Sequence, residues 1–411
     1  MKQQTLNDIC ELIVDCEHKT APIQEIGYPS IRTPNVGKGR LILDGVNRVS
    51  EKVYQKWTRR AVPKTGDIIL AREAPLGNAA VITEGQVVCL GQRTVLIRPD
   101  TNQVNPNYLV YYLLGDEVQG QFHSKGAGAT VPHINMSDIR GLLIPQLPPR
   151  EVQDRIADIL SAFDDLIENN ARRIRILEQI ARDLYQEWFI HFRFPGHQGQ
   201  SYSFDNLPTD WSIKLLGDIA CQKRDSVDPA DVDSATPYVG LEHIPRKTIA
   251  LFDWGKASEV NSTKLVFTEG DILFGKIRPY FHKVVVAPTS GVASSDAIVI
   301  TPREPRYFAS VLLSVSSEDF VAHATQTSQG TKMPRANWDI LVKYPVAIPD
   351  EALLRQFNEI VADTVSQINN LVLRSRKLEE TRDLLLPRLI SGELDVSHLH
   401  NQIEELEVTE T

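Results

Sequence analysis

A basic stretch near the start of the chain has the residue types that nucleic-acid binding requires. Between residues 30 and 65 the acidic side chains are Asp44 and Glu51, and Tyr54 and Trp57 are interleaved with the cations. Cations neutralise phosphates, and planar groups such as Arg, Gln and Asn hydrogen-bond to base edges. A mixed, solvated surface is the alternative that this stretch leaves open. The candidate contacts are Arg32, Lys38, Arg40, Arg48, Lys52, Lys56, Arg59, Arg60 and Lys64.

A milder basic group lies about 200 residues further on, and each group is followed by a Gly-rich loop. The loops are residues 125–130 and 327–332, whose backbone amides and hydroxyls could meet phosphates or simply form turns. The further candidate contacts are Arg72, Thr130, Lys276, Arg278, Tyr280, His282, Lys283, Thr331, Lys332 and Arg335.

The sequence gives no reason to predict a catalytic centre. It contains no GxxxxGK[ST] loop, no GxGxxG after a strand, and no Asn/Asp-Pro-Pro-aromatic run of an amino-methyltransferase. Cys10, Cys16, Cys89 and Cys221 are scattered without a CxxC pair, so we expect reduced thiols and no metal site.

These candidate residues belong to a chain that repeats itself. Residues 66–70 (GDIIL) return as 270–274 (GDILF), 204 positions later, and residues 177–178 return as 378–379, 201 positions later. Residues 6–9 return as 216–219 at an offset of 210, so the insertions lie early in each copy. Solenoid repeats run about 20–50 residues, so this is a duplicated domain-sized unit. Two related surfaces would suit binding at two places on one long ligand.

Each copy is predicted to begin with a mixed α+β domain. Short β-type runs such as 67–70, 94–97 and 297–300 are separated by Gly and Pro, and residues 107–114 and 307–313 indicate matching short helices. The predicted domains are 1–149 and 195–349, with long helices at 150–194 and 350–391 and a tail at 392–411.

The long helices carry apolar residues at 4-3 spacing, which is typical of a coiled-coil seam. One helix cannot bury such a stripe alone, so we expect the two helices to pack against each other as antiparallel partners; capping of each helix's own domain is the alternative. Pro387 is expected to stop or kink the second helix. Asn170 is a polar seam residue of the kind that sets register. The predicted seam residues are Ile156, Leu160, Phe163, Ile167, Asn170, Ile174, Leu177, Leu184, Val361, Ile368, Leu371, Leu378 and Leu385.

Length and composition are those of an ordinary globular protein. The 411 residues are 42% hydrophobic and 24% charged, and no apolar run approaches a membrane span or a signal peptide, so we expect a cytoplasmic protein. The net charge of −9 conceals an uneven distribution. Residues 1–150 hold 17 Lys and Arg against 14 Asp and Glu, whereas residues 351–411 hold 6 against 12. The acidic excess therefore lies outside the first domain.

Several motifs resemble the specificity subunit of Type I restriction–modification systems. The most specific are LYQEWFIHFRFPG at 184–196 and LLLPRLISGELDV at 384–396, after the two long helices. GDIILAREAPLG at 66–77, GDILFGKIRPYFHKV at 270–284 and SSDAIVI at 294–300 are similar to target-recognition-domain motifs of that family.

The resemblance implies a non-catalytic subunit that binds a bipartite double-stranded DNA target. It implies two target-recognition domains held apart by two antiparallel helices, two methyltransferase subunits on those helices, and restriction nuclease–translocase subunits joining the complex. S-adenosylmethionine, ATP and Mg²⁺ are then expected on the partner subunits, with no cofactor on this chain. The competing hypotheses are a coiled-coil scaffold with two protein-binding modules and no DNA binding, and an enzyme with an unrecognised site.

Overall fold

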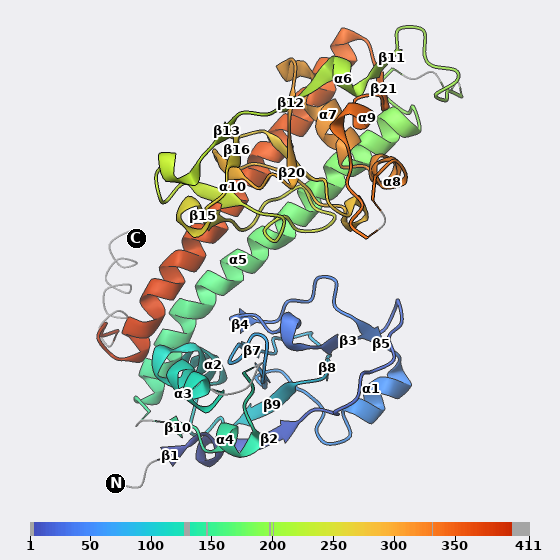
Figure 1. Cartoon of the computed structure of the whole chain (residues 1–411). Coiled ribbons are helices and arrows are strands. Elements are labelled where there is room, and N and C mark those ends of the chain that lie inside the picture. Colours follow the sequence, from blue (N-terminus) through green and yellow to red (C-terminus); the bar gives the residue numbers. More distant parts are fainter. Residues whose placement is uncertain are drawn as a thin grey trace, which may run out of the picture. The chain divides into compact units, whose positions relative to one another are not determined.

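The computed structural model describes residues 4–126, 132–144, 147–196, 199, 201–330 and 332–396. The chain divides into two compact units (Figure 1): unit 1 is Met1–Ile167 with Leu378–Thr411, and unit 2 is Glu168–Lys377. Both units contain strands and helices, which confirms the predicted mixed α+β class. None of the helices in the described ranges combines the length and the hydropathy that a membrane span requires.

Unit 1 is built around a five-stranded sheet with the order β2-β9-β6-β7-β4. Unit 1 also contains a three-stranded sheet with the order β5-β3-β8, and β1 pairs with β10. The strands are β1 (Gln4–Thr5), β2 (Cys10–Asp15), β3 (Tyr28–Ile31), β4 (Gly39–Arg40), β5 (Arg48–Val49), β6 (Ile68–Ala71), β7 (Ala79–Val81), β8 (Cys89–Leu90), β9 (Thr94–Pro99) and β10 (Leu143–Ile144).

Several helices accompany the sheets of unit 1, and most of them contribute buried side chains to its core. They are α1 (Glu51–Trp57), α2 (Pro106–Leu114), α3 (Asp116–Gly126) and α4 (Met136–Arg140), together with the parts of two long helices described below. Asn105 starts α2 by accepting from the amide of Asn107 at 2.8 Å, and Pro106 fills the first turn. Tyr108 and Phe122 are buried in the same apolar cluster as strand residue Ile68.

Unit 2 contains a four-stranded sheet, β12-β20-β17-β18, and a five-stranded sheet, β13-β16-β19-β14-β15, while β11 pairs with β21. Its short helices are α6 (Leu216–Ile219), α7 (Phe308–Val315), α8 (Glu318–Gln326) and α9 (Trp338–Leu341). The strands are β11 (Ser212–Leu215), β12 (Ala220–Lys223), β13 (Ser226–Val227), β14 (Pro237–Val239), β15 (Gly255–Lys256), β16 (Lys264–Phe267), β17 (Ile272–Gly275), β18 (Val284–Val286), β19 (Gly291–Ala293), β20 (Ala297–Pro302) and β21 (Pro345–Ile348).

The two units share one strand order, as the sequence repeat predicts. β2-β9-β6-β7 of unit 1 corresponds to β12-β20-β17-β18 of unit 2, and all of these neighbours are antiparallel. In both units three further strands follow one pattern. β3 pairs antiparallel with β5 and parallel with β8, and β14 pairs antiparallel with β15 and parallel with β19. Unit 2 extends this second sheet with β16 and β13, which unit 1 lacks among its described residues. The copies therefore share a scaffold and differ in their second sheet.

The repeated Gly-Asp pair, Gly66-Asp67 and Gly270-Asp271, has the same structural role in both units. Each glycine has a positive φ, 86° and 84°, which favours glycine over other residues. Asp67 is buried and accepts from Arg98 at 2.7 Å, and Asp271 is buried and accepts from Lys223 at 2.7 Å. A buried carboxylate requires such a partner, so the motif fixes the turn before the central strand of each unit.

Two long helices each contribute to both units: α5 (Arg150–Tyr185) and α10 (Glu351–Ile390). Their 36 and 40 residues correspond to about 54 and 60 Å at 1.5 Å per residue. A π-helical turn, Gln186–Ile190, follows α5. Pro387 lies in the last turn of α10, which continues to Ile390. Of the two effects expected of this proline, a stop or a kink, the stop is therefore wrong.

Burial along both helices follows the 4-3 spacing. All thirteen predicted seam side chains are buried or half-buried. Ile156 and Leu160 join the apolar core of unit 1, whereas Ile174, Val361, Ile368 and Leu371 join that of unit 2. In unit 2, Asn170 donates to the hydroxyl of Ser375 at 3.2 Å, which links α5 to α10 directly.

A buried ion pair links the same two helices within unit 1. Asp164 of α5 pairs with Arg382 of α10, and both side chains are nearly inaccessible to solvent. The hydroxyl of Tyr111 on α2 donates to the second oxygen of Asp164 at 2.6 Å. The charge network therefore holds both long helices against the body of unit 1. Burial and the Asp164 charge both raise the pKa of Tyr111, which keeps its hydroxyl protonated as a donor.

Candidate nucleic-acid interface

In unit 2 the structure brings two of the predicted basic segments together. Strand β17 ends at Gly275, and Lys276 follows it. The amide of Ala336 donates to the carbonyl of Lys276, and the amide of Arg278 donates to the carbonyl of Pro334, each at 2.8 Å. Sequence spacing does not predict this pairing, because the two segments are some 60 residues apart.

A cavity of about 550 Å³ opens where these segments meet. Lys276 and Arg335, both predicted contacts, line it together with Gln222, Arg224 and Gln329. Arg335 lies 3.9 Å from Asp296, and Arg224 lies 3.7 Å from Asp339; both arginines are more than half exposed. No ion pair of Lys276 is found among the described residues. Cations and planar amides around one hollow are the groups that contact phosphates and base edges.

Gln222, Arg224 and Gln329 were not predicted from the sequence. Gln222 is on β12 and Arg224 directly follows that strand, so their approach to β17 depends on the strand order. Gln329 is placed by a backbone bridge to Arg335, with N–O distances of 2.9 and 3.0 Å. Lys332 is exposed, and Thr331 lies outside the described residues.

The remaining predicted residues of unit 2 flank a short helical turn, Pro279–Phe281. Arg278 and His282 have positive φ values of 50° and 52°, and Tyr280 is half exposed. The guanidinium of Arg278 lies 5.9 Å from the ring centre of Phe281. The ammonium of Lys283 donates to the carbonyl of Leu241, and burial lowers the pKa of this lysine.

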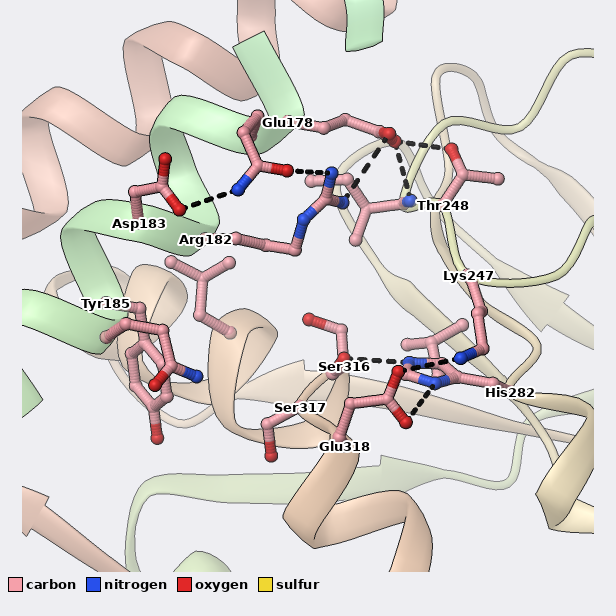
Figure 2. A pocket seen from close by; sticks show the side chains of 15 residues that line it. Glu178, Arg182, Asp183, Tyr185, Lys247, Thr248, His282, Ser316, Ser317 and Glu318 are labelled. Atoms are coloured by element: carbon pink, nitrogen blue, oxygen red, sulfur yellow. Dashed lines mark hydrogen bonds and ion pairs between the residues drawn. The ribbon is translucent and has the colours of Figure 1, made fainter. Parts of the chain in front are cut away.

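His282 faces a second cavity, of about 350 Å³, rather than open solvent (Figure 2). Its Nε2 lies 2.8 Å from the carbonyl oxygen of Ser316, so Nε2 carries the proton, and its Nδ1 lies 3.6 Å from Glu318. The ammonium of Lys247 donates to the same glutamate at 2.9 Å. The imidazole is 7% exposed, so it supports this loop from within.

On the far wall of this cavity a buried glutamate anchors the loop at residues 248–250 to α5 (Figure 2). Glu178 accepts from the hydroxyl of Thr248, from the amide of Ile249 at 2.8 Å and from that of Ala250 at 3.1 Å. Arg182 lies 3.7 Å from its other oxygen. The sequence repeat contains Glu178, but the residue's role depends on a loop 70 positions away.

Unit 1 has the same backbone link with a different charge arrangement. The amide of Ile134 donates to the carbonyl of Arg72 at 3.2 Å, as Ala336 does to Lys276 in unit 2. The guanidinium of Arg72 is buried and donates to both oxygens of Asp15, at 3.0 and 2.9 Å. Through the shared strand register, Asp15 takes the place that Arg224 has in unit 2. Arg72 is therefore neutralised inside the domain.

Several other predicted contacts of unit 1 also have partners within the chain. Arg40 pairs with Asp165 at 2.7 Å, and Lys38 lies 3.8 Å from Asp383. Arg48 donates to the carbonyl of Gly27, and Arg59 pairs with Glu17 at 2.7 Å. Arg60 donates to the carbonyls of Asp15 and Cys16. Arg32, Lys52 and Lys56 are exposed, and Thr130 lies outside the described residues.

One group among the described residues brings three potential metal ligands together: Asp15, Cys16 and His18. Both oxygens of Asp15 already bind Arg72. Burial, the largest effect, raises the pKa of the Cys16 thiol and disfavours the thiolate that binds metals. These contacts identify the group as part of the Arg72 ion pair.

Comparisons with known proteins point to one family. Residues 1–179 match the family model described as the Type I restriction modification DNA specificity domain. The Type I restriction enzyme MjaIX specificity subunit of Methanocaldococcus jannaschii is 29% identical over 86% of this chain and 83% of its own length. The EcoDI specificity subunit of Escherichia coli is 26% identical over 74% of this chain and 73% of its own length. A solved Type I system S subunit from M. genitalium shares the fold, with a TM-score of 0.56 and 17% identity over 94% of this chain and 95% of that one.

Proposed function

We propose that this chain, which belongs to the Type I restriction–modification DNA specificity family, reads a DNA target in two parts, one with each unit. The observation that carries the proposal is the shared scaffold with unlike surfaces. The same strand order and the same backbone link return in both units, whereas Arg72 is neutralised by Asp15 and Lys276 lines an open cavity beside Arg224. Two domains with the same fold but different charged side chains at their surfaces suit a target whose halves differ in sequence.

In this proposal the chain positions other subunits and performs no chemistry itself. α5 and α10 each begin in one unit and end in the other, so they can set the spacing between the half-targets as well as provide a surface for two methyltransferase subunits. The methyltransferase subunits would carry S-adenosylmethionine, and nuclease–translocase subunits would add ATP-driven cleavage. We expect these partners to add phosphate contacts, because a net charge of −9 opposes DNA binding by this chain alone.

The test is methylation mapping by the reconstituted methyltransferase complex on random-sequence DNA. The expected result is a split motif, with two short specified blocks around an unspecified spacer. Replacing residues 1–149 with the corresponding domain of another family member should change one block and leave the other intact. A continuous motif, or a change in both blocks, would refute independent reading by the two units. Absence of specific DNA binding would favour the protein scaffold.

The basic residues of unit 2 give a second, local test. Lys276→Ala should weaken binding to specific and random DNA alike and lower the magnitude of the salt slope by about one. Lys343→Ala removes an equal charge from an exposed position outside the cavity and is the matched control. Equal effects of the two variants would show that the cavity contributes only net charge.

A further inference from the structure

The helix α1 is a short element that contributes no buried residue to the core of unit 1. Seven residues form a marginal helix on their own, so its neighbours must hold it. Ser50 caps it by accepting from the amide of Val53 at 3.3 Å. Tyr54 stacks on Tyr28 with the ring centres 4.3 Å apart and the planes 20° from parallel. The helix is therefore anchored along one side, beside β8 (Figure 1).

The opposite side of α1 presents Lys52, Gln55 and Lys56, all exposed. Residues three and four positions apart share one face of a helix, so these side chains form a single polar strip. No ion pair of either lysine is found among the described residues, although the ammonium of Lys56 lies 5.7 Å from the ring centre of Trp57. Gln55 donates one amide hydrogen to Glu51 at 3.3 Å, which leaves its carbonyl oxygen available.

Three arginines of the basic stretch differ from this strip. Arg40, Arg59 and Arg60 all have partners within unit 1, and the carboxylates of Asp165 and Glu17 take up two of these charges. The structure therefore leaves the lysines of α1 as outward-facing cations of the segment, beside a planar amide that can both donate and accept hydrogen bonds.

α1 also lies where the two units diverge. In unit 1 it occupies the chain between β5 and β6. At the corresponding place, between β15 and β17, unit 2 has the strand β16. There Lys264 is 5% exposed, and its ammonium donates to the hydroxyl of Ser262 at 2.6 Å. The shared sheet is unaffected by the exchange, so α1 alters the surface of unit 1 without altering its scaffold.

From this arrangement we infer that α1 lies in the major groove of the first half-target, where Gln55 reads an adenine and Lys52 and Lys56 contact flanking phosphates. The inference rests on the proposed DNA-reading function and names the element that reads. A major groove about 12 Å wide admits a helix, and glutamine pairs with adenine N6 and N7 through one acceptor and one donor. Seven residues span about 10 Å, so the strip fits within a few base pairs.

The test compares Gln55→Ala, Lys52→Ala and Lys56→Ala in the full methyltransferase complex, with affinity measured at several salt concentrations and methylation mapped on random DNA. Gln55→Ala should reduce discrimination at one adenine of the first block by roughly 5- to 150-fold and leave the second block unchanged. Each lysine variant should weaken binding on all sequences and lower the magnitude of the salt slope by about one. Gln103→Ala, at an exposed position of unit 1 outside α1 and the two long helices, is the matched control.

The outcomes separate this inference from the function on which it rests. If the wild-type complex methylates a split motif and Gln55→Ala leaves that motif unchanged, the role of α1 is refuted. The proposal that the chain reads its target in two parts would still stand. Relaxation in the second block, or an equal loss of affinity on all sequences, would also overturn base reading by Gln55. A wild-type complex without a split motif would refute the proposed function itself. Thermal unfolding of each variant checks the fold, because all three side chains are exposed and their removal should leave Tm unchanged.

Discussion

Replacing Glu178 should release the loop at residues 248–250 of unit 2 from helix α5. The carboxylate is 4% exposed and accepts from the amides of Ile249 and Ala250 and from the hydroxyl of Thr248. Glu178→Ala leaves the buried amide of Ile249 without an acceptor, whereas the amide of Ala250 keeps the hydroxyl of Thr248 at 3.2 Å. A stranded buried donor costs about 1–3 kcal/mol, and the lost bond from the Thr248 hydroxyl adds to this. Relief of burying a charge offsets part of this cost, and we expect a net loss near ~2 kcal/mol.

The conservative variant separates hydrogen bonding from charge. Glu178→Gln keeps an oxygen that can accept from both amides, so its loss should be nearer 1 kcal/mol. Arg182 lies 3.7 Å away with its side chain 41% exposed, so the lost ion pair adds little. Gln179→Ala, at the next and exposed position, should change the stability by less than about 0.5 kcal/mol.

Denaturant unfolding followed by tryptophan fluorescence measures these differences, because Trp188, Trp211, Trp254 and Trp338 are in unit 2 and only Trp57 is in unit 1. Methylation mapping in parallel should show the second block weakened by Glu178→Ala and the first block retained. Equal stability of Glu178→Ala and Gln179→Ala would refute the reasoning that the carboxylate anchors this loop.

Two further predictions concern polar groups of unit 2. Asn170→Leu should raise the free energy of unfolding by about 1 kcal/mol, because a polar seam residue costs stability while it specifies the register of the two helices. A second set of NMR signals from α5 and α10 would report the lost register. A lower denaturation midpoint of the variant would contradict this role. The hydrogen bond from Lys247 holds the pKa of Glu318 below its ordinary range, so the stability that this pair contributes is present at neutral pH and is lost as pH falls through the folded-state pKa. Glu318→Gln should therefore flatten the acid side of the pH–stability curve, and an unchanged curve would show that the pair contributes nothing.

The internal repeat and the hydrophobic periodicity of the sequence predicted most of the architecture. The internal repeat predicted two related units, and the 4-3 spacing predicted α5 and α10 and the face that each buries. The predicted helices at 107–114 and 307–313 appear as α2 and α7. Such features depend on neighbours within one or two helical turns or on alternation along a strand, so the sequence states them directly. The stop expected at Pro387 was wrong, because Leu386 and Leu389 on either side of it pack in the apolar core of unit 1 and the helix continues to Ile390.

Whether each cation is available for a ligand was decided by long-range pairing. Arg72 and Lys276 occupy equivalent positions after equivalent strands, and nothing local distinguishes them. Strand pairing places Asp15 against Arg72 and Arg224 near Lys276, so one cation is buried in an ion pair and the other lines a cavity. The sequence by itself determined the two-part scaffold and the supply of basic residues. Only the tertiary structure decided which of them face outward, because the partner that neutralises a charge is set by strand order and loop packing across tens of residues.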